Sequence, residues 1–329
     1  MPTMQDIAKK CGVSKSTVSK ALNGASDVSQ SLRRMIIETA IDLGYNRTIQ
    51  LSGEKKLALF IGSSKKQLPG HFGYKMIQSI KKEALIHDFQ LDIHLLEDID
   101  MKNTRYDSFM LEHKYMGGFF LSMHGDEDWL EQFNHTKTPT ILNDRYCWNE
   151  KVSCVSIDTM EGIHKIIRHL YHSGHTRIGY LSSHISAYIF QQRYHNYLLT
   201  MEHYNLPVDE RQVGLEQDSE ECIQKHLQNL IDFGCTAIVC SHDTLALRAL
   251  EYCQKNNIPV PEKVSFVGID DIEGSALSTP PLTTLRQNQI VLGKSCFFAL
   301  MGQIQGSCVS RTLIHPELIL RDSVKNLLE

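Results

Sequence analysis

The chain has 329 residues, nine cysteines and a formal net charge of −4. This length allows two or three domains with a sizeable core, and the composition is ordinary for a soluble globular protein. No apolar run approaches the roughly 18 to 20 residues of a membrane span, and no basic-then-apolar export signal opens the chain. The cysteines are scattered without a C-x-x-C pair, so we expect reduced thiols, a cytoplasmic location and no membrane partner.

The first predicted element is a short helix near the N-terminus. Thr3 and Asp6 form a variant of the capping box that opens a helix, and Ile7 and Ala8 begin its apolar face. Gly12 falls in the turn that follows, where glycine adopts a positive φ at little cost. Because Ala8 is small, a second helix is able to approach this one closely.

That second helix is predicted to begin after Ser14, a good N-cap residue. Val18, Ala21 and Leu22 have i, i+3, i+4 spacing and give the helix one buried face. Its other face carries hydroxyl and ammonium groups suited to the base edges and phosphates of DNA. We therefore predict DNA contacts from Thr3, Ser14, Lys15, Ser16, Thr17, Ser19, Lys20, Asn23 and Ser29.

A third helix is predicted from Ser29 to Leu43, ended by Gly44. Residues 1–56 contain nine Lys and Arg against five Asp and Glu, a net charge of +4. The remainder carries −8, because the whole chain carries −4. A generic three-helix bundle is the alternative interpretation, but this charge asymmetry favours a nucleic-acid-binding head on an acidic body.

The rest of the chain begins with a polar linker at residues 46–56 and then alternates short apolar runs with amphipathic segments. This alternation predicts an α/β fold with one or two doubly wound units of parallel sheet. A helix is expected at 72–87. The expected strands are Leu57–Ser63, Leu91–Leu96, Gly118–Ser122, Thr138–Asn143, Val152–Ile157, Ile178–Ser182, Thr236–Ser241 and Ser265–Ile269.

Four segments in register resemble the lactose/galactose repressor family. They are Asp6-Ile7-Ala8 to Leu22-Asn23, Gly174-His175-Thr176-Arg177-Ile178-Gly179, Val264-Ser265-Phe266-Val267-Gly268-Ile269-Asp270-Asp271 and Pro281-Leu282-Thr283-Thr284-Leu285. The resemblance covers nearly the whole chain. It implies a helix-turn-helix DNA-binding domain followed by two similar lobes, like those of periplasmic sugar-binding proteins, with an effector held between them.

The same resemblance implies the domain boundaries. The DNA-binding domain is expected at 1–45, the hinge at 46–56 and the effector-binding and dimerisation core at 57–329. Within the core, the N-lobe is expected at about 57–157 and 288–318, and the C-lobe at about 158–287 and 319–329. The chain would thus cross between lobes near residues 157, 287 and 319.

Motifs of catalysis are absent from the sequence. There is no G-x-G-x-x-G, no P-loop lysine motif and no G-x-S-x-G elbow. The run His169-x-x-His172-x-x-His175 is the best candidate for a metal site, but no Cys or carboxylate completes it at zinc spacing. The acidic pair Asp270-Asp271 has no nucleophile or partner motif. We expect no catalytic residue, no metal and no cofactor, so the chain is not predicted to be an enzyme.

Polar and aromatic residues do follow several predicted strands, where two-lobed α/β proteins bind ligands. By resemblance, Arg193 and Asp270 match the effector-binding arginine and aspartate of the family, and an arginine fork with carboxylates suits hydroxyl-rich or charged molecules. The alternative for each residue is a capping or salt-bridging role. The predicted effector-binding residues are His71, Phe72, Ser122, Asp144, Arg193, His242 and Asp270.

The sequence departs from the family in several places. The arginine motif continues as Arg193-Tyr194-His195-Asn196-Tyr197, without the usual glycine, and His242 replaces the usual Asn. Glu216 and Gln217 lie where relatives often place an aromatic residue that stacks on a sugar or base. The linker is shorter and lacks the usual Pro, which leaves Leu51 as the candidate for the leucine that relatives insert into the minor groove.

These observations predict an effector-controlled transcription regulator, a repressor that binds a pseudo-palindromic operator in double-stranded DNA. A homodimer is expected, because one small head makes too few contacts for a specific site, and because only Lys325–Glu329 follows Val324, where tetrameric relatives carry a leucine-repeat helix. The effector is expected to be a sugar or related metabolite. A solute-binding protein and a sugar-converting enzyme are the alternatives.

Overall fold

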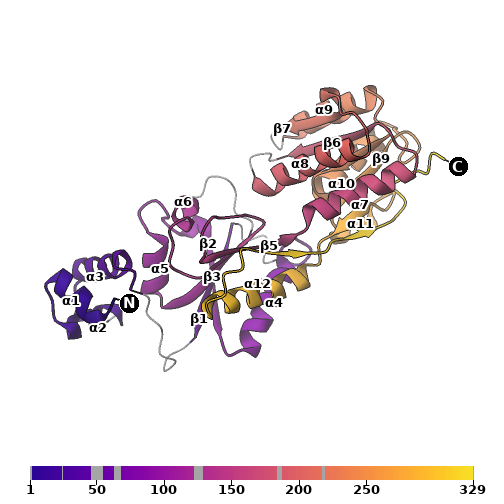
Figure 1. Cartoon of the computed structure of the whole chain (residues 1–329). Helices are drawn as coiled ribbons and strands as arrows, with labels where there is room; N and C mark the ends of the chain where they lie inside the picture. The colour runs from indigo at the N-terminus through magenta and orange to yellow at the C-terminus, as the bar shows by residue number, and fades with distance from the viewer. Residues whose placement is uncertain are drawn as a thin grey trace. The chain divides into compact units, whose positions relative to one another are not determined.

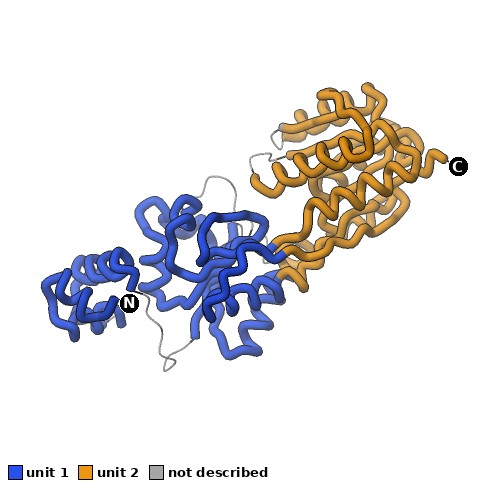
Figure 2. Tube along the Cα trace, viewed as in Figure 1, with its two compact units in different colours: residues 1–65, 76–155, 293–312 blue, residues 66–75, 156–292, 313–329 orange. Residues whose placement is uncertain are grey.

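A computed structural model describes residues 2–23, 25–45, 55–62, 68–121, 129–183, 187–216 and 219–328. The chain divides into two compact units, shown in Figure 2. Unit 1 comprises residues 1–65, 76–155 and 293–312, and unit 2 comprises residues 66–75, 156–292 and 313–329. The short segment 66–75, which lies within the expected N-lobe, is grouped with unit 2.

The N-terminal part of unit 1 is a cluster of three helices (Figure 1). These are α1 (Met4–Cys11), α2 (Lys15–Leu22) and α3 (Gln30–Asp42). Apolar side chains from all three helices fill one core, with Ile7, Val18 and Ile36 fully buried. The turn after α1 contains Gly12 in the left-handed conformation, with φ of 67°. The predicted helix-turn-helix is therefore present.

The remainder of unit 1 is built on a six-stranded sheet with the order β11-β5-β4-β3-β1-β2. Strands β1 to β5 pair in parallel. Their bounds are β1 (Lys56–Ile61), β2 (Gln90–Leu95), β3 (Tyr115–Leu121), β4 (Thr140–Asn143), β5 (Val152–Ile157) and β11 (Arg311–Ile314). The associated helices are α4 (Tyr74–Ile86), α5 (Tyr106–Glu112), α6 (Trp129–Phe133) and α12 (Gln289–Ile304). Buried rings, among them Phe60, Tyr106 and Trp129, form much of this core.

Unit 2 repeats the design with a sheet of order β12-β10-β9-β8-β6-β7, in which only β12 runs antiparallel to its neighbour. The strands are β6 (Ile178–Ser183), β7 (Val213–Glu216), β8 (Ala237–Cys240), β9 (Ser265–Asp270), β10 (Thr283–Arg286) and β12 (Glu317–Ile319). The helices are α7 (Thr159–His172), α8 (Tyr188–His203), α9 (Glu220–Asp232), α10 (Asp243–Lys255) and α11 (Glu273–Leu277).

The strand order of unit 2 reverses between β6 and β8. From β6 the chain moves outward to β7, and it then returns to the other side of β6 to form β8, β9 and β10 in turn. Helix α7 packs against α8, whereas α9 and α10 share a separate core with Leu181 and Phe266 of the sheet (Figure 1). In open α/β sheets such a reversal opens a crevice at the carboxyl ends of the strands.

The predicted α/β fold with a helical head is confirmed, but the predicted strand series was incomplete. Strands β7, β10, β11 and β12 were missed. Each has only three or four residues, and β11 and β12 are edge strands with exposed side chains. β10 is buried but begins with two threonines, so none of these segments presents an apolar run.

Candidate DNA-reading head and effector site

The head begins with the capping box expected from the sequence. The Asp6 amide donates to Thr3 Oγ1 (3.4 Å), and the Thr3 amide donates to Asp6 Oδ2 (2.7 Å). Hydrogen bonds from the Thr3 side chain and backbone lower the pKa of the Asp6 carboxyl. The Thr17 amide donates to Ser14 Oγ (3.0 Å) and so caps α2. Both helices of the motif therefore begin where the sequence places them.

The predicted DNA-reading residues lie on the solvent side of the head. Lys15 and Ser16 are exposed in the first turn of α2, opposite the buried Val18 and Leu22. Thr17 and Ser19 are partly buried. The remaining exposed members of the set are Thr3, Ser14, Lys20, Asn23 and Ser29. This arrangement presents hydroxyl and ammonium groups on one helix while the opposite side of that helix fills the core.

Lys20 and Leu51 differ from the other predicted DNA contacts. Lys20 Nζ lies 2.5 Å from Asp27 Oδ2, and both side chains are more than half exposed. An exposed pair of this kind is weak, so Lys20 is able to exchange Asp27 for a phosphate. Leu51, the predicted minor-groove residue, lies outside the described residues.

The effector residues predicted for unit 2 meet at the carboxyl ends of β6, β8 and β9. Arg193 projects from α8, which follows β6, and is 3% exposed. Its Nη1 donates to the backbone carbonyl of Ser241 (2.5 Å), the residue after β8, and its Nη2 lies 3.8 Å from Asp270 Oδ1 at the end of β9. Arg193, on the helix that follows β6, therefore contacts the residues at the ends of β8 and β9.

Asp270 is held in a conformation that non-glycine residues rarely adopt, with φ of 134°. Its Oδ1 accepts a hydrogen bond from Gln287 Nε2 (2.5 Å), which follows β10. Its side chain is 12% exposed. Strained residues fixed by their neighbours cluster at ligand sites, and the position of Asp270 fits such a role.

Three buried polar atoms at this edge have no hydrogen-bond partner within the described part of the chain. They are Arg193 Nε, Gln287 Oε1 and Ser183 Oγ. The three residues are at most 3% exposed. A buried polar atom left unsatisfied costs about 1–3 kcal/mol. The edge therefore holds donor and acceptor capacity that the described protein groups do not use.

An aromatic pair lies beside Arg193. The ring centroids of Phe190 and His242 are 5.4 Å apart at an interplanar angle of 35°, and both residues are partly buried. Arg193 Cζ lies 5.5 Å from the centroid of Phe190. His242 Nδ1 lies 3.0 Å from Ser241 Oγ. The two rings thus come from the residues that follow β6 and β8.

Asp243, the first residue of α10, binds the segments that follow β9 and the buried strand β10. It is fully buried, and it accepts hydrogen bonds from Thr284 Oγ1 (2.5 Å), Ser275 Oγ (2.6 Å) and the Ile272 amide (3.1 Å). Burial raises the pKa of the Asp243 carboxyl, although these hydrogen bonds oppose the rise. Gly268 leaves the space that Asp243 occupies, since a Cβ at residue 268 would collide with Asp243 Oδ1.

The other predicted effector residues are less closely tied to Arg193. His71 is exposed and Phe72 is partly buried in the segment grouped with unit 2, and the next amide, that of Gly73, donates to Gln289 Oε1 (2.8 Å). Asp144 follows β4 in unit 1 with φ of 58°. Ser122 lies outside the described residues.

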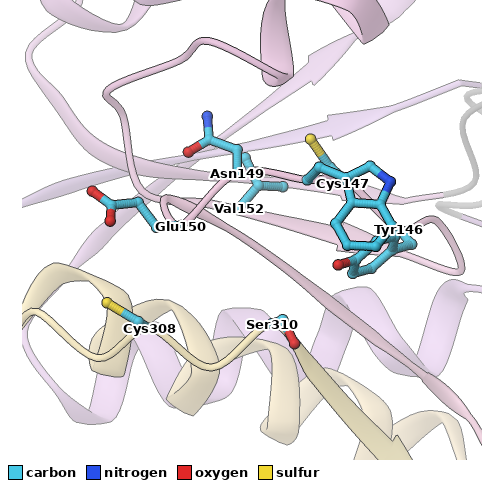
Figure 3. Close-up of a pocket in the computed structure, with 8 residues that line it drawn as sticks. Tyr146, Cys147, Asn149, Glu150, Val152, Cys308 and Ser310 are labelled. Atoms are coloured by element: carbon cyan, nitrogen blue, oxygen red, sulfur yellow. The ribbon is translucent and has the colours of Figure 1, made fainter.

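Two surface hollows are lined by residues outside the predicted effector set, although Asp271 in the second lining directly follows Asp270. The first, in unit 1, has a volume of about 180 Å³ (Figure 3). It is lined by Tyr146, Cys147, Trp148, Asn149, Glu150, Val152, Cys308 and Ser310. The second, in unit 2, has a volume of about 470 Å³ and is lined by Lys75, Asp271, Ile272, Glu273, Ala276, Leu277 and Arg321. Neither lining contains a predicted effector residue, so the hollows do not mark that site.

The last histidine of the run His169-x-x-His172-x-x-His175 is bound to protein groups. His175 is buried, and its two ring nitrogens lie 2.9 Å from Thr236 Oγ1 and from the Lys325 carbonyl. Across the described ranges, no group of three or more His, Cys, Asp or Glu side chains is arranged to hold a metal ion. All nine cysteines are free thiols. No helix in the described ranges is long and apolar enough to span a membrane.

Sequence reasoning missed Gln287 and Phe190. Gln287 directly follows β10, a strand that was not predicted, and bonds to Asp270. Phe190 lies three residues before Arg193 on α8, and its ring contact with His242 depends on the folded sheet. A search for polar and aromatic residues after every short strand, and one turn before each candidate arginine, would have found both.

Comparisons with known proteins agree with this architecture. Residues 3–48 match the model of the family described as "Bacterial regulatory proteins, lacI family". Residues 167–324 match the model described as "Periplasmic binding protein-like domain". The HTH-type transcriptional repressor PurR of Actinobacillus pleuropneumoniae serotype 3 (strain JL03) is 26% identical over 99% of each chain. The repressor CytR of Escherichia coli (strain K12) is 26% identical over 99% of this chain and 97% of its own.

Solved structures have the same fold. The transcriptional regulator CelR in complex with cellobiose has a TM-score of 0.71 at 22% identity, covering 98% of this chain and 100% of its own. The lac repressor dimer bound to operator and the anti-inducer ONPF has a TM-score of 0.69 at 21% identity, covering 98% and 99%. The chain therefore combines a lacI-family helix-turn-helix domain with a periplasmic-binding-protein-like domain. It is a DNA-binding transcriptional repressor and not an enzyme.

Proposed function

We propose that this repressor binds a pseudo-palindromic operator as a homodimer in the cytoplasm. We further propose that a small molecule, a sugar or related metabolite, changes its operator affinity by binding at the carboxyl edge of the unit 2 sheet. The predicted DNA and effector residues keep the roles assigned above. The observation that carries the effector proposal is Arg193, which is buried between two strand ends with its Nε unpartnered among the described residues.

Three observations support the homodimer. One head with a single reading helix gives few base contacts, and paired heads on two half-sites supply the rest. Large apolar side chains are also exposed in both units, with Leu85 of α4 78% exposed and Leu277 of α11 76% exposed. A second copy of the chain would cover such surfaces. The solved lac repressor with the same fold is described as a dimer on its operator.

The chemistry of the edge supports a hydroxyl-bearing effector. Arg193 Nε is a donor, and Gln287 Oε1 is an acceptor. Both atoms are buried in the structure. A hydroxyl group both donates and accepts, so hydroxyls that enter the edge when its side chains rearrange would satisfy both atoms. The solved CelR neighbour is described as a complex with cellobiose, which has this chemistry. A ligand of this kind would alter operator binding only if it binds one arrangement of the protein better than another.

The test for DNA binding is selection of sites from a random pool by the full-length protein. We expect an enriched sequence with two inverted half-sites whose centres are about 10 base pairs apart or a multiple of that distance. Sedimentation of the free protein should give a dimer, and Leu277→Glu should weaken it. A single half-site bound by a monomer would contradict the homodimer.

The test for effector control is operator affinity, read by fluorescence anisotropy with and without added compounds. The panel contains cellobiose, ribose, cytidine, adenine, glucose 6-phosphate and mixed amino acids. We expect one of these to change affinity by about 5- to 150-fold, in either direction. Arg193→Ala should abolish that change, whereas Arg248→Ala should not, because Arg248 pairs with Glu220 at the surface. An unchanged response in Arg193→Ala would contradict the assigned site.

A further inference from the structure

An acidic residue lies beside the basic, hydroxyl-rich side of α2. Asp27, in the loop between α2 and α3, has a side chain that is 55% exposed, and its Oδ2 accepts a hydrogen bond from Lys20 Nζ (2.5 Å). This hydrogen bond lowers the pKa of the Asp27 carboxyl, so the group stays ionised at neutral pH. DNA phosphates repel a carboxylate. An ionised Asp27 therefore opposes DNA binding unless it has a partner on the DNA.

Lys20 lies on the side of α2 that is predicted to read DNA. It follows Ser16 by four residues, and residues four apart share one face of a helix. Both residues are exposed, whereas Val18 and Leu22 fill the core of the head. Because Asp27 is hydrogen-bonded to Lys20, this side of the helix presents an ammonium group and a carboxylate next to each other.

The loop between α2 and α3 fixes the position of Asp27. The Ala25 amide donates to the Lys20 carbonyl (3.0 Å), and the Ala25 carbonyl accepts from Arg33 Nη2 of α3 (2.5 Å). Val28, directly after Asp27, is buried in the core of the head. The backbone on both sides of Asp27 is therefore attached to the helices, and the carboxylate is positioned before any DNA binds.

The major-groove edge of a G·C base pair is complementary to these two groups. Guanine presents the acceptors N7 and O6, and cytosine presents the N4 amino donor beside them. Lysine commonly donates to guanine, and aspartate is able to accept from cytosine N4. The exposed ion pair is weak in water, so its separation by a base edge costs little. A phosphate, in contrast, would attract Lys20 and repel Asp27.

We infer that Asp27 is a specificity-determining residue, which accepts a hydrogen bond from the N4 amino group of a cytosine while Lys20 donates to the paired guanine. The inference rests on the proposed operator binding, and it adds a residue that is not among the DNA contacts predicted from the sequence. It requires one G·C base pair in each half-site whose recognition depends on both Lys20 and Asp27.

The experiment is site selection from a random DNA pool by the full-length wild type, Asp27→Ala and Glu38→Ala. Glu38→Ala is the matched control, because Glu38 of α3 also pairs with an exposed cation, Arg34 (3.0 Å), and its removal changes the charge of the head by the same amount. We expect Asp27→Ala to relax the preference at one G·C position in each half-site. Glu38→Ala should select the wild-type consensus.

Operator affinities then measure the size of the effect. Fluorescence anisotropy at one salt concentration compares the selected operator with a copy in which that G·C pair is replaced by A·T in both half-sites. We expect the wild type and Glu38→Ala to prefer the G·C operator at least about tenfold. Asp27→Ala should lose most of this preference, and Lys20→Ala should lose preference at the same base pair. Circular dichroism checks that each variant is folded.

The outcomes separate the inference from the proposed operator binding. If Asp27→Ala and Glu38→Ala bind all sequences more tightly and keep the wild-type preference, Asp27 only neutralises charge and the inference is overturned. It is also overturned if the consensus has no G·C position that depends on Asp27, or if Lys20→Ala relaxes a different base pair. If the wild type enriches no sequence, the proposed operator binding fails and the inference fails with it.

Discussion

The helix-turn-helix head and the carboxyl edge of unit 2 place their proposed functional residues in opposite ways. In the head, they are mostly exposed and lie between Thr3 and Ser29 on short neighbouring helices. At the edge of unit 2, Arg193, Asp270 and Gln287 come from distant parts of the chain, and Arg193 and Gln287 are almost fully buried. The first surface is a local product of helix periodicity, whereas the second exists only after the sheet has formed.

This difference has a consequence for mutation. Exposed head residues act one at a time, so their substitution should change DNA binding without changing the fold. The edge residues share hydrogen bonds, so removal of one leaves others buried and unsatisfied. We therefore expect large stability effects in unit 2 and small ones in the head.

The largest effect is expected for Asp243→Ala. This change removes the acceptor for Ser275, Thr284 and the Ile272 amide in a fully buried place. With about 1–3 kcal/mol for each buried group left unsatisfied, the loss in free energy of unfolding should be about 3 kcal/mol or more. Urea unfolding followed by circular dichroism measures it.

The matched control for that change is Glu251→Ala, on the same helix as Asp243. Glu251 is exposed, and its ion-pair partner within the described part of the chain is Lys255, whose side chain is 69% exposed. Its loss should change the free energy of unfolding by less than about 0.5 kcal/mol. Equal effects of the two substitutions would contradict the assigned role of Asp243.

The next largest effect is a pH dependence at Asp271, whose side chain is 10% exposed. Burial acts to raise the pKa of this carboxyl, but hydrogen bonds from Arg321 and Arg286 outweigh burial, and the pKa is lowered. A carboxyl with a lowered pKa in the folded state stabilises the protein above its ordinary pKa. That stability is lost as the pH falls through the folded-state value.

Asp271→Asn tests this directly. At neutral pH the variant should be less stable, because two charged hydrogen bonds of about 1.5–3 kcal/mol each are weakened. Below about pH 4 the gap between wild type and variant should narrow. Unfolding midpoints of wild type and variant, measured from pH 7 to pH 3, give the difference in stability at neutral pH and its change at low pH. A gap that stays constant with pH would show that the Asp271 carboxylate does not provide this stability.

The same contrast explains what the sequence could predict. The head follows from local rules, since Thr3, Ser14 and Gly12 act within one or two turns of their own position. Arg193 and Asp270 were found through family resemblance. Gln287 was missed because its contact with Asp270 depends on β10, whose Thr283-Thr284 start hides a buried strand. The hydroxyl of Thr284 donates a hydrogen bond to the buried Asp243. The two residues are far apart in the sequence, so this hydrogen bond could not be predicted from the sequence pattern.

A smaller effect is expected for Lys15→Ala and Ser16→Ala in the first turn of α2. Loss of one base contact should cost about 1–3 kcal/mol in operator binding and relax the preferred base at one position. Lys9→Ala and Lys10→Ala should weaken all sequences alike, because they are exposed charges on α1. Selection from a random pool measures the preference. The same consensus for wild type, Lys15→Ala and Ser16→Ala would contradict the assigned face.

The smallest effect is expected for Thr3→Ala, which removes the N-cap of α1. Loss of a threonine N-cap costs about 1 kcal/mol of helix stability, and the Asp6 carboxylate then lacks the Thr3 hydroxyl that donates to it at 2.8 Å. Hydrogen exchange of head amides should therefore become faster, while amides of the unit 2 sheet keep the wild-type rate. Thr3→Ser preserves the hydroxyl and should restore slow exchange. If the unit 2 amides were to exchange faster as well, the head would not be the independent local structure that distinguishes it from the buried edge.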